Sequence, residues 1–336
     1  MNIYILAFLL LFTVSSSSFL LKNHPGPKTE KPGKANIVFK STDGGQTWQD
    51  ISKGLPENLR EVGIRGNSIF ANDKGLFLRL GNGLYHNTPN ATAPFWTKEV
   101  NTNEHSSIAP GKAGIFYWGV NLKKTNGTSV WSPIFENIHD TRVRSVFETT
   151  GGAIFILNAD GLYKTTDNGK TWKRVHTQGM DGNMAELDGV LMAASMRKII
   201  RSTDNGENWE VVSGEGYLTF DVKEIKGGFA AITASSETNP RILRTSYDGG
   251  KTWQPIEAGL QDKILRTWND RHAPQMNITS ITQVDENLIC THRDGIFRST
   301  DKGKTWKLLL PSVQKKGFNL FVSGNVIYAI PSKGGC

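Results

Sequence analysis

Cysteine is nearly absent from this sequence: its 336 residues include only Cys290 and Cys336. Two cysteines cannot form a disulfide framework, which excludes the class of small disulfide-stapled domains. The sequence leaves two alternatives for this pair. The two thiols form a bond in an oxidising compartment, or Cys290 is a small buried residue of a strand and Cys336 is a free terminal thiol.

Convincing helix patterns are also missing, and with them the glycine-rich loops that hold phosphates at the start of a helix, so nucleotide chemistry is not supported. The seven histidines do not fall at the intervals of metal ligands, so we expect no zinc site and no cofactor. The net charge is +8, from 39 Lys and Arg against 31 Asp and Glu. This balance permits an acidic partner but falls short of the signature of a nucleic-acid-binding protein.

Charged side chains are absent from the first 21 residues. The apolar run from Ile3 to Val14 has about the length of a signal-peptide core and is too short to cross a bilayer comfortably. Residues 1–21 are therefore predicted to be an export signal, or an uncleaved anchor that contacts the membrane if residues 19–21 extend the run. Residues 22–34, rich in Pro, Gly and Lys, are predicted to be a flexible tether. We expect the protein to be extracellular, periplasmic or in a secretory lumen.

One octapeptide pattern occurs five times: STDGGQTW at residues 41–48, TTDNGKTW at 165–172, STDNGENW at 202–209, SYDGGKTW at 246–253 and STDKGKTW at 299–306. The pattern resembles the Asp-box (BNR) repeat of sialidases, sortilin-type receptors, some glycan hydrolases and Ycf48/Hcf136-like assembly factors. The resemblance implies a β-propeller. It also implies ligand sites in the central channel or on the face opposite the boxes.

The box chemistry is local, because an Asp and a Ser or Thr hydroxyl can bond the backbone N–H groups of a tight turn while Gly supplies a conformation that other residues resist. A carboxylate repeated in five equivalent turns cannot be one catalytic acid, so we interpret the box residues as structural. A Ca²⁺ site would need a string of alternating oxygen ligands that these turns lack. The structural box residues are Asp43, Gly45, Trp48, Asp167, Gly169, Trp172, Asp204, Gly206, Trp209, Asp248, Gly250, Trp253, Asp301, Gly303 and Trp306.

Two ladders of residues predict the number of blades. Tryptophans occur at positions 48, 96, 131, 172, 209, 253 and 306, at roughly the period of a propeller blade. Apolar strands that follow a turn residue begin near residues 66, 114, 151, 189, 227, 286 and 324. Both ladders predict that residues 35–336 form a single, all-β, seven-bladed propeller of four-stranded antiparallel blades.

The two ends of the chain predict how the ring closes. After Trp306 the sequence completes one blade and then supplies only the first and second strands of another. The segment around Trp48 supplies only a third and a fourth strand. We expect these N-terminal and C-terminal strands to pair in one blade, which removes the open sheet edge.

Cations collect in the connections between blades. The longest connection, Glu257 to Asn277, is the strongest candidate for a functional loop because loops of this length usually bind something. A solvated surface loop is the alternative. The candidate binding residues are Arg60, Arg142, Arg144, Arg266, Trp268, Asp270, Arg271 and His272.

A glycan hydrolase is the rival class of function. Sialidases are expected to have six blades and an Arg-Ile-Pro motif, and this sequence contains no Arg-Ile-Pro. A sialidase reaction could still use Glu215 and Tyr217 as a base and nucleophile pair. Two facing carboxylates could come from Asp140, Asp181 and Asp270. No catalytic constellation stands out, so we favour a monomeric binding or assembly module for an acidic protein, peptide or glycan partner, with no catalytic residue assigned and no nucleic acid expected.

Overall fold

The computed structural model describes residues 37–56, 64, 68–93, 95–101, 106–112, 114–118, 122–125, 131–135, 143–195, 198–213, 217–235, 241–256, 260, 278–312 and 317–331. Contacts divide the chain into two units, Met1–Lys34 and Ala35–Cys336, and every described residue belongs to the second. The predicted export signal and tether lie outside the described residues and stay predictions. No helix in the described part of the chain is long and apolar enough to span a membrane.

Six sheets are each built from four consecutive strands in antiparallel order. The first contains β3 (Ile69–Asn72), β4 (Gly75–Leu80), β5 (Gly83–Asn87) and β6 (Thr97–Asn101). The second contains β7 (Ser107–Pro110), β8 (Ile115–Trp118), β9 (Leu122–Thr125) and β10 (Trp131–Phe135). The third contains β11 (Val143–Glu148), β12 (Ile154–Asn158), β13 (Leu162–Thr165) and β14 (Lys173–His176).

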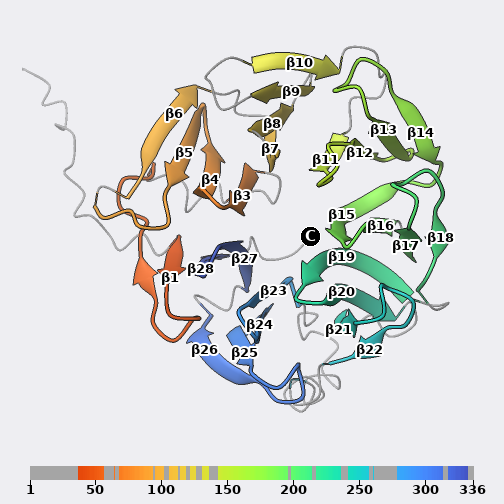
Figure 1. The fold of residues 1–336 in the computed structure, drawn as a ribbon. Helices are drawn as coiled ribbons and strands as arrows, with labels where there is room; N and C mark the ends of the chain where they lie inside the picture. The colour runs from red at the N-terminus through yellow and green to blue at the C-terminus, as the bar shows by residue number, and fades with distance from the viewer. Residues whose placement is uncertain are drawn as a thin grey trace, which may run out of the picture. The chain divides into compact units, whose positions relative to one another are not determined.

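The fourth sheet contains β15 (Met180–Leu187), β16 (Val190–Ser195), β17 (Lys198–Ser202) and β18 (Glu210–Val211). The fifth contains β19 (Tyr217–Ile225), β20 (Gly228–Ser235), β21 (Arg241–Ser246) and β22 (Gln254–Pro255). The sixth contains β23 (Ser280–Val284), β24 (Asn287–His292), β25 (Gly295–Ser299) and β26 (Lys307–Pro311). Figure 1 shows these blades around a common axis, with the first strand of each blade innermost.

The predicted count of seven blades is corrected: the chain builds six blades from four consecutive strands each. The four remaining strands form a composite sheet in the order β2-β1-β28-β27. Its strands are β1 (Phe39–Ser41), β2 (Gln49–Asp50), β27 (Phe318–Ser323) and β28 (Val326–Pro331). Each end of the chain supplies only two strands, so neither end contains a complete blade.

The predicted pairing of the two ends is confirmed. In the composite sheet, β1 runs antiparallel to β28, with Phe39 opposite Ala329 and Ser41 opposite Ile327. The outer strand β2 pairs with β1, and the inner strand β27 pairs with β28. Residues almost 290 positions apart are thereby joined by a backbone ladder, which covers the edge that β28 would otherwise expose.

The core lies between neighbouring sheets. The second strand of each blade is covered on both faces by adjacent blades, so it is a nearly continuous apolar run rather than an alternating one. All five residues of β12 are buried. One face of β12 packs with Ala109 and Phe116 of the preceding blade, and the other packs with Leu191 and Ile200 of the following blade.

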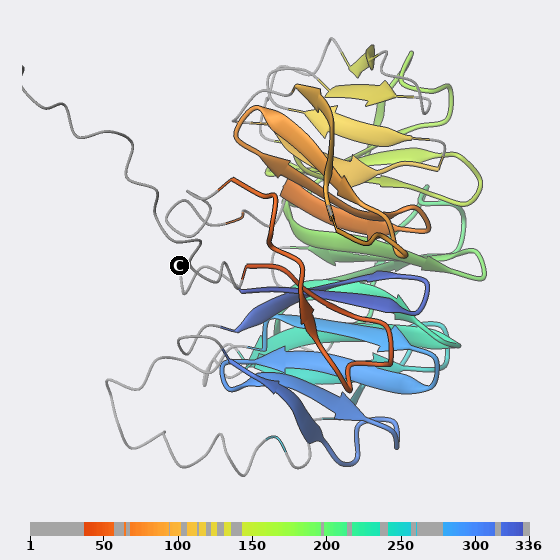
Figure 2. The same cartoon turned by 90° about the vertical axis from the view of Figure 1, so that its left-hand side faces the viewer.

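The five boxes form the same hydrogen-bonded turn between the third and fourth strands. In the first box, the Ser41 hydroxyl donates to Asp43 Oδ1 at 2.8 Å and accepts from the Gly45 amide at 2.8 Å. Asp43 also accepts from the Thr47 amide and from the Thr47 hydroxyl at 2.6 Å. Trp48 Nε1 closes the turn by donating to the Gly45 carbonyl at 2.8 Å. Figure 2 shows hairpin turns of several blades projecting on one side of the ring.

The box glycine is required by both backbone and packing. Gly206 has φ +80°, a left-handed conformation that costs energy for other residues. A Cβ added at Gly206 would lie 2.5 Å from the ring of Phe155 in the preceding blade. The box therefore fixes its own turn and also the distance between two blades.

Basic residues directly before a box connect it to the next box along the ring. Lys164 Nζ lies 2.5 Å from Glu207 Oε1, and Arg201 Nε donates to the Gly249 carbonyl at 2.7 Å. The blade of β3 to β6 has no box. There Trp96 Nε1 donates to the carbonyl of Ile51 in the composite sheet at 2.7 Å.

Removing the closing strands tests the composite sheet. A chain that begins at Pro56 lacks β1 and β2, so β28 loses its ladder and the surrounding core loses Val38 and Ile51. We expect the single cooperative urea transition, followed by tryptophan fluorescence and circular dichroism, to become broad or to disappear. A chain that begins at Ala35 is the matched control and should unfold like the full chain. An unchanged midpoint and slope for the Pro56 chain would contradict this role of the ends.

The box carboxylates predict acid sensitivity. Burial alone raises the pKa of Asp43, but hydrogen bonds from Thr47, Ser41 and Gln46 lower that pKa to about 2. Hydrogen bonds from Thr305, and then from Ser299, lower the pKa of Asp301 to about 2. A carboxylate whose pKa is lower in the folded state than in the unfolded chain stabilises the fold at any pH above its unfolded-state pKa, which is about 3.9. This stabilisation is lost as the pH falls through the folded-state pKa.

We therefore expect the free energy of unfolding to decline between about pH 4 and pH 2 as the boxes protonate. The variant Asp301→Asn should be less stable than wild type at pH 7 and should show a shallower decline. The control Asp73→Asn changes an exposed acid in the β3–β4 turn and should leave the decline unchanged. Parallel wild-type and Asp301→Asn curves in urea titrations across this range would refute the interpretation.

Candidate functional site

Most of the candidate binding residues lie outside the described residues. This applies to Arg60, Arg142, Arg266, Trp268, Asp270, Arg271 and His272. The same holds for Asp140 and Glu215, whereas Asp181 and Tyr217 are placed only as positions in β15 and β19. The predicted functional loop and the facing-carboxylate alternative therefore stay predictions. Arg144, in β11, is described and is exposed.

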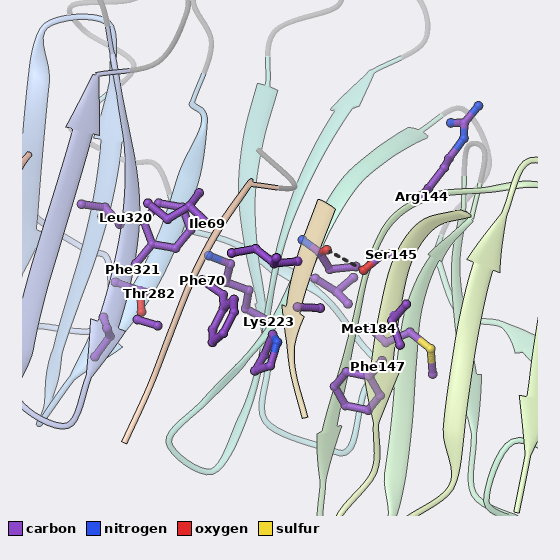
Figure 3. Close-up of a pocket in the computed structure, with 18 of the residues that line it drawn as sticks. Ile69, Phe70, Arg144, Ser145, Phe147, Met184, Lys223, Thr282, Leu320 and Phe321 are labelled. Atoms are coloured by element: carbon purple, nitrogen blue, oxygen red, sulfur yellow. Dashed lines mark hydrogen bonds between the residues drawn. The ribbon is translucent and has the colours of Figure 1, made fainter. Parts of the chain in front are cut away.

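Arg144 lies at a central cavity of about 400 Å³. The first strands of the six blades and the inner strand β27 of the composite sheet all contribute to its lining, together with Trp118 of β8. Figure 3 shows Lys223 and Phe70 in the middle of the cavity lining, while Arg144 extends away from them at one end. The volume falls within the range of small-molecule binding pockets.

Polar side chains lie along one part of the cavity wall, on the consecutive strands β11, β15, β19 and β23. The Ser145 hydroxyl donates to Asn183 Oδ1 at 3.4 Å, and Asn183 Nδ2 donates to Asp221 Oδ1 at 2.8 Å. Lys223 Nζ lies 4.0 Å from Asp221 Oδ2 and donates to the Ser280 hydroxyl at 3.4 Å. Three hydrogen bonds and one ion pair therefore form a continuous series across four blades.

A second series explains why these side chains lie at one level. Each of the four strands has a Glu or Gln three residues after its network residue, at positions 148, 186, 224 and 283. Glu148 accepts from the Lys112 amide at 2.6 Å, Glu186 accepts from the Thr150 amide at 2.6 Å, and Gln283 accepts from the Lys226 amide at 2.9 Å. Each contact joins an inner strand to the first turn of the preceding blade and so fixes the register between blades.

Asp221 is the carboxylate that links Asn183 to Lys223 in the polar network. Its side chain is only 15% exposed, and burial raises its pKa despite the opposing effects of Lys223, Asn183 and Arg241. Arg241 lies over the ring of Phe220 at 4.1 Å, and burial lowers its pKa. Behind the lining residue Lys223 there is therefore a carboxylate whose charged form is disfavoured by burial.

The rest of the cavity wall is apolar. The consecutive inner strands β27, β3 and β7 contribute nine lining residues, and none of the nine is polar. They are Leu320, Phe321, Val322, Ile69, Phe70, Ala71, Ile108, Ala109 and Pro110.

Sequence reasoning found Arg144 but missed Asn183, Asp221, Lys223 and Thr282. A signal was present: Ser145, Asn183, Asp221 and Ser280 each precede a Glu or Gln by three residues, in SVFE, NMAE, DVKE and SITQ. The tryptophans and the boxes carry the strongest repeat in the sequence, but they lie far from the inner strands along each blade and so do not mark these residues.

Metal ligands and thiols can be assessed within the described residues. No group of three or more His, Cys, Asp and Glu within the described ranges is arranged to hold a metal ion. Cys290 is a free, buried thiol in β24, and burial raises its pKa. A buried thiol with a raised pKa is unreactive. Its predicted alternative partner, Cys336, lies outside the described residues.

Asp221→Asn tests the electrostatics of the cavity wall. Because the folded-state pKa is raised, the folded protein binds more protons than the unfolded chain, and wild type gains stability as the pH falls through the folded value. We expect the Asn variant to be more stable than wild type at pH 7.5 in urea titrations, with the difference shrinking toward about pH 4. A variant that is less stable than wild type by the same amount at every pH would contradict the raised pKa.

Solved structures with a similar fold include virginiamycin B lyase from Staphylococcus aureus. It is 11% identical to this chain, the alignment covers 79% of this chain and 94% of the lyase chain, and the TM-score is 0.56. A streptogramin B lyase is 13% identical, with 78% and 92% covered and a TM-score of 0.55.

The extracellular domain of a putative hybrid two component system from B. thetaiotaomicron is 10% identical, with a TM-score of 0.53. That alignment covers 80% of this chain but only 38% of the other. Identities this low show the fold alone. No curated protein matches this chain in sequence.

Two families match the sequence itself. The BNR/Asp-box repeat matches residues 39–50, which include the first box, so the resemblance of the boxes to this repeat is confirmed. The DUF6242 beta propeller domain matches residues 112–335, about two thirds of the chain. The chain therefore belongs to the DUF6242 beta propeller domain family.

Proposed function

We propose that this protein is an exported binding module that takes an acidic group of a protein or glycan partner at its central cavity. The observation that carries the proposal is the cavity itself: inner strands from the entire ring line one space of about 400 Å³, and the cation Arg144 lies at it. A concave site with a few polar groups among apolar ones is the usual form of a ligand site in a protein.

The charge of the chain supports an acidic partner. The net charge is +8, and a guanidinium group such as that of Arg144 can bind a carboxylate through two parallel hydrogen bonds. The sequence candidates Arg266, Trp268, Arg271 and His272 would extend this basic surface. The resemblance of the boxes to those of sortilin-type receptors and Ycf48/Hcf136-like assembly factors is consistent with a binding or assembly role.

Export rests on the uncharged, apolar first 21 residues of the sequence. The boxes and the seams between blades form a scaffold that positions the inner strands, and rigid scaffolds suit sites that need fixed geometry.

A binding array tests the proposed function. The protein would be applied to paired acidic and neutral glycans and peptides that differ only in a carboxylate or sulfate. We expect binding to the acidic member of at least one pair, weakened by salt and reduced about tenfold in Arg144→Ala, which is the effect of losing about 1.4 kcal/mol.

Lys307→Ala is the matched control, because Lys307 is an exposed cation on the outer strand β26. Its removal should leave binding unchanged. A second variant, with Arg266, Trp268, Arg271 and His272 all changed to Ala, tests the predicted loop. Equal binding by wild type and Arg144→Ala would contradict the role of the Arg144 guanidinium in binding. Hydrolysis of any arrayed glycan would instead favour the hydrolase alternative.

A further inference from the structure

The cavity wall divides into two arcs of unlike chemistry. The polar arc consists of β11, β15, β19 and β23, which supply every polar lining residue: Arg144, Ser145, Asn183, Lys223 and Thr282. The apolar arc consists of β27, β3 and β7, whose nine lining residues are all apolar. Neighbouring inner strands are in contact around the ring, so each arc is a continuous surface.

Three of the four strands of the polar arc also differ in backbone from the apolar arc, whereas the fourth, β23, pairs with β24 without a register shift. The pairing of the first and second strands shifts register at residues 143–145 in β11, 180–184 in β15 and 219–221 in β19. The corresponding pairs β27–β28, β3–β4 and β7–β8 of the apolar arc have no such shift. Bulges re-aim side chains and are concentrated beside functional sites. Here they accompany Arg144, Asn183 and Asp221.

Lys223 is the cation best placed to receive a ligand. Its side chain is 30% exposed and lines the cavity. An ammonium group has three N–H donors, whereas the contacts of Lys223 with Ser280 and Asp221, at 3.4 and 4.0 Å, are both long. Asp221 already accepts from Asn183 at 2.8 Å, and it does not itself line the cavity. The charge presented to the cavity is therefore positive.

We propose that the cavity binds an amphipathic anion, with its apolar body against β27, β3 and β7 and its anionic head group at Lys223; this inference rests on the proposed function. A fully polar ligand such as a neutral oligosaccharide would leave hydroxyl groups unpaired against the apolar arc. A fully apolar ligand would cover Lys223 and leave its charge without a partner. Carboxylate and sulfonate head groups share the required chemistry.

Two related dyes separate the contributions of the arcs. The first, 8-anilinonaphthalene-1-sulfonate, has an aromatic body and one sulfonate; the second, N-phenyl-1-naphthylamine, is the same body without the charge. We expect the sulfonate to bind the folded protein with one-to-one stoichiometry by fluorescence titration and native mass spectrometry, and more tightly than the neutral dye. Dodecanoate and dodecyl sulfate, added as competitors of the bound sulfonate dye, compare a carboxylate head group with a sulfate head group.

Variants assign the head group and the body. Lys223→Gln, and Lys223→Met if the first variant folds poorly, should weaken the sulfonate at least tenfold and change the neutral dye less than twofold. Ala71→Asp places a carboxylate in the apolar arc and should weaken both dyes. Lys307→Gln removes an equal charge from the outer strand β26 and should change neither. Circular dichroism and the unfolding midpoint establish that each variant is folded.

The outcomes separate the two proposals. Equal affinity for the two dyes, with no effect of Lys223→Gln or Lys223→Met, would overturn the anionic head group while leaving the cavity as a binding site. Binding that survives Ala71→Asp would place the dyes elsewhere and overturn the two-arc assignment. If neither dye binds, the amphipathic-anion inference fails, whereas the proposed function fails only if the array of acidic glycans and peptides also shows no binding.

Discussion

The antiparallel pairing of β1 with β28 is the contact on which the rest of this fold depends. A propeller blade cannot bury both faces by itself, because each face is covered by a neighbouring blade. Closing the ring gives every sheet two neighbours, and here closure is made by backbone hydrogen bonds between the two ends of the chain. The inner strands β27 and β3 are brought together by the same closure, so the apolar arc of the cavity exists only in the closed ring.

Two sets of contacts between neighbouring blades then hold the blades at fixed distances. At the hairpin side, each box holds its own turn and contacts the blade before it, as Gly206 does with the ring of Phe155. At the inner strands, Glu148, Glu186 and Gln283 accept backbone hydrogen bonds from the preceding blade. The contacts of Glu148 and Glu186 fix the register of β11 and β15 against the blades that precede them. Between β15 and β19, Asn183 and Asp221 are joined directly, at 2.8 Å.

Part of this structure follows directly from the residues. The boxes are local, so their turns and their approximate spacing can be recognised in the sequence, and the incomplete strand sets at the two ends predict the composite sheet. The blade count is wrong where the chain does not build complete units. The seven tryptophans of the ladder, out of nine in the sequence, mark seven sheets, of which six are blades built from consecutive strands. Trp96 marks a blade that has no box and bonds instead to Ile51 of the composite sheet.

The cavity could not be predicted in the same way. Asn183 and Asp221 are 38 residues apart and meet only because successive blades have matched lengths and registers. Three of the four polar-arc strands carry a register shift, and a bulge of one residue leaves no clear mark in an alternating strand. The loop from Glu257 to Asn277 is a candidate because of its length and charge. Neither property indicates where the loop lies relative to the cavity.

A crystal structure of the protein with 8-anilinonaphthalene-1-sulfonate bound would test the central claim, that the closed ring forms a two-sided ligand site, most directly. The account predicts one dye molecule in the central cavity, with the sulfonate within hydrogen-bond distance of Lys223 Nζ and the rings against Phe70 and Phe321 of the apolar arc. A dye bound on the outer strands, or in the cavity with its sulfonate turned away from the polar arc, would contradict it.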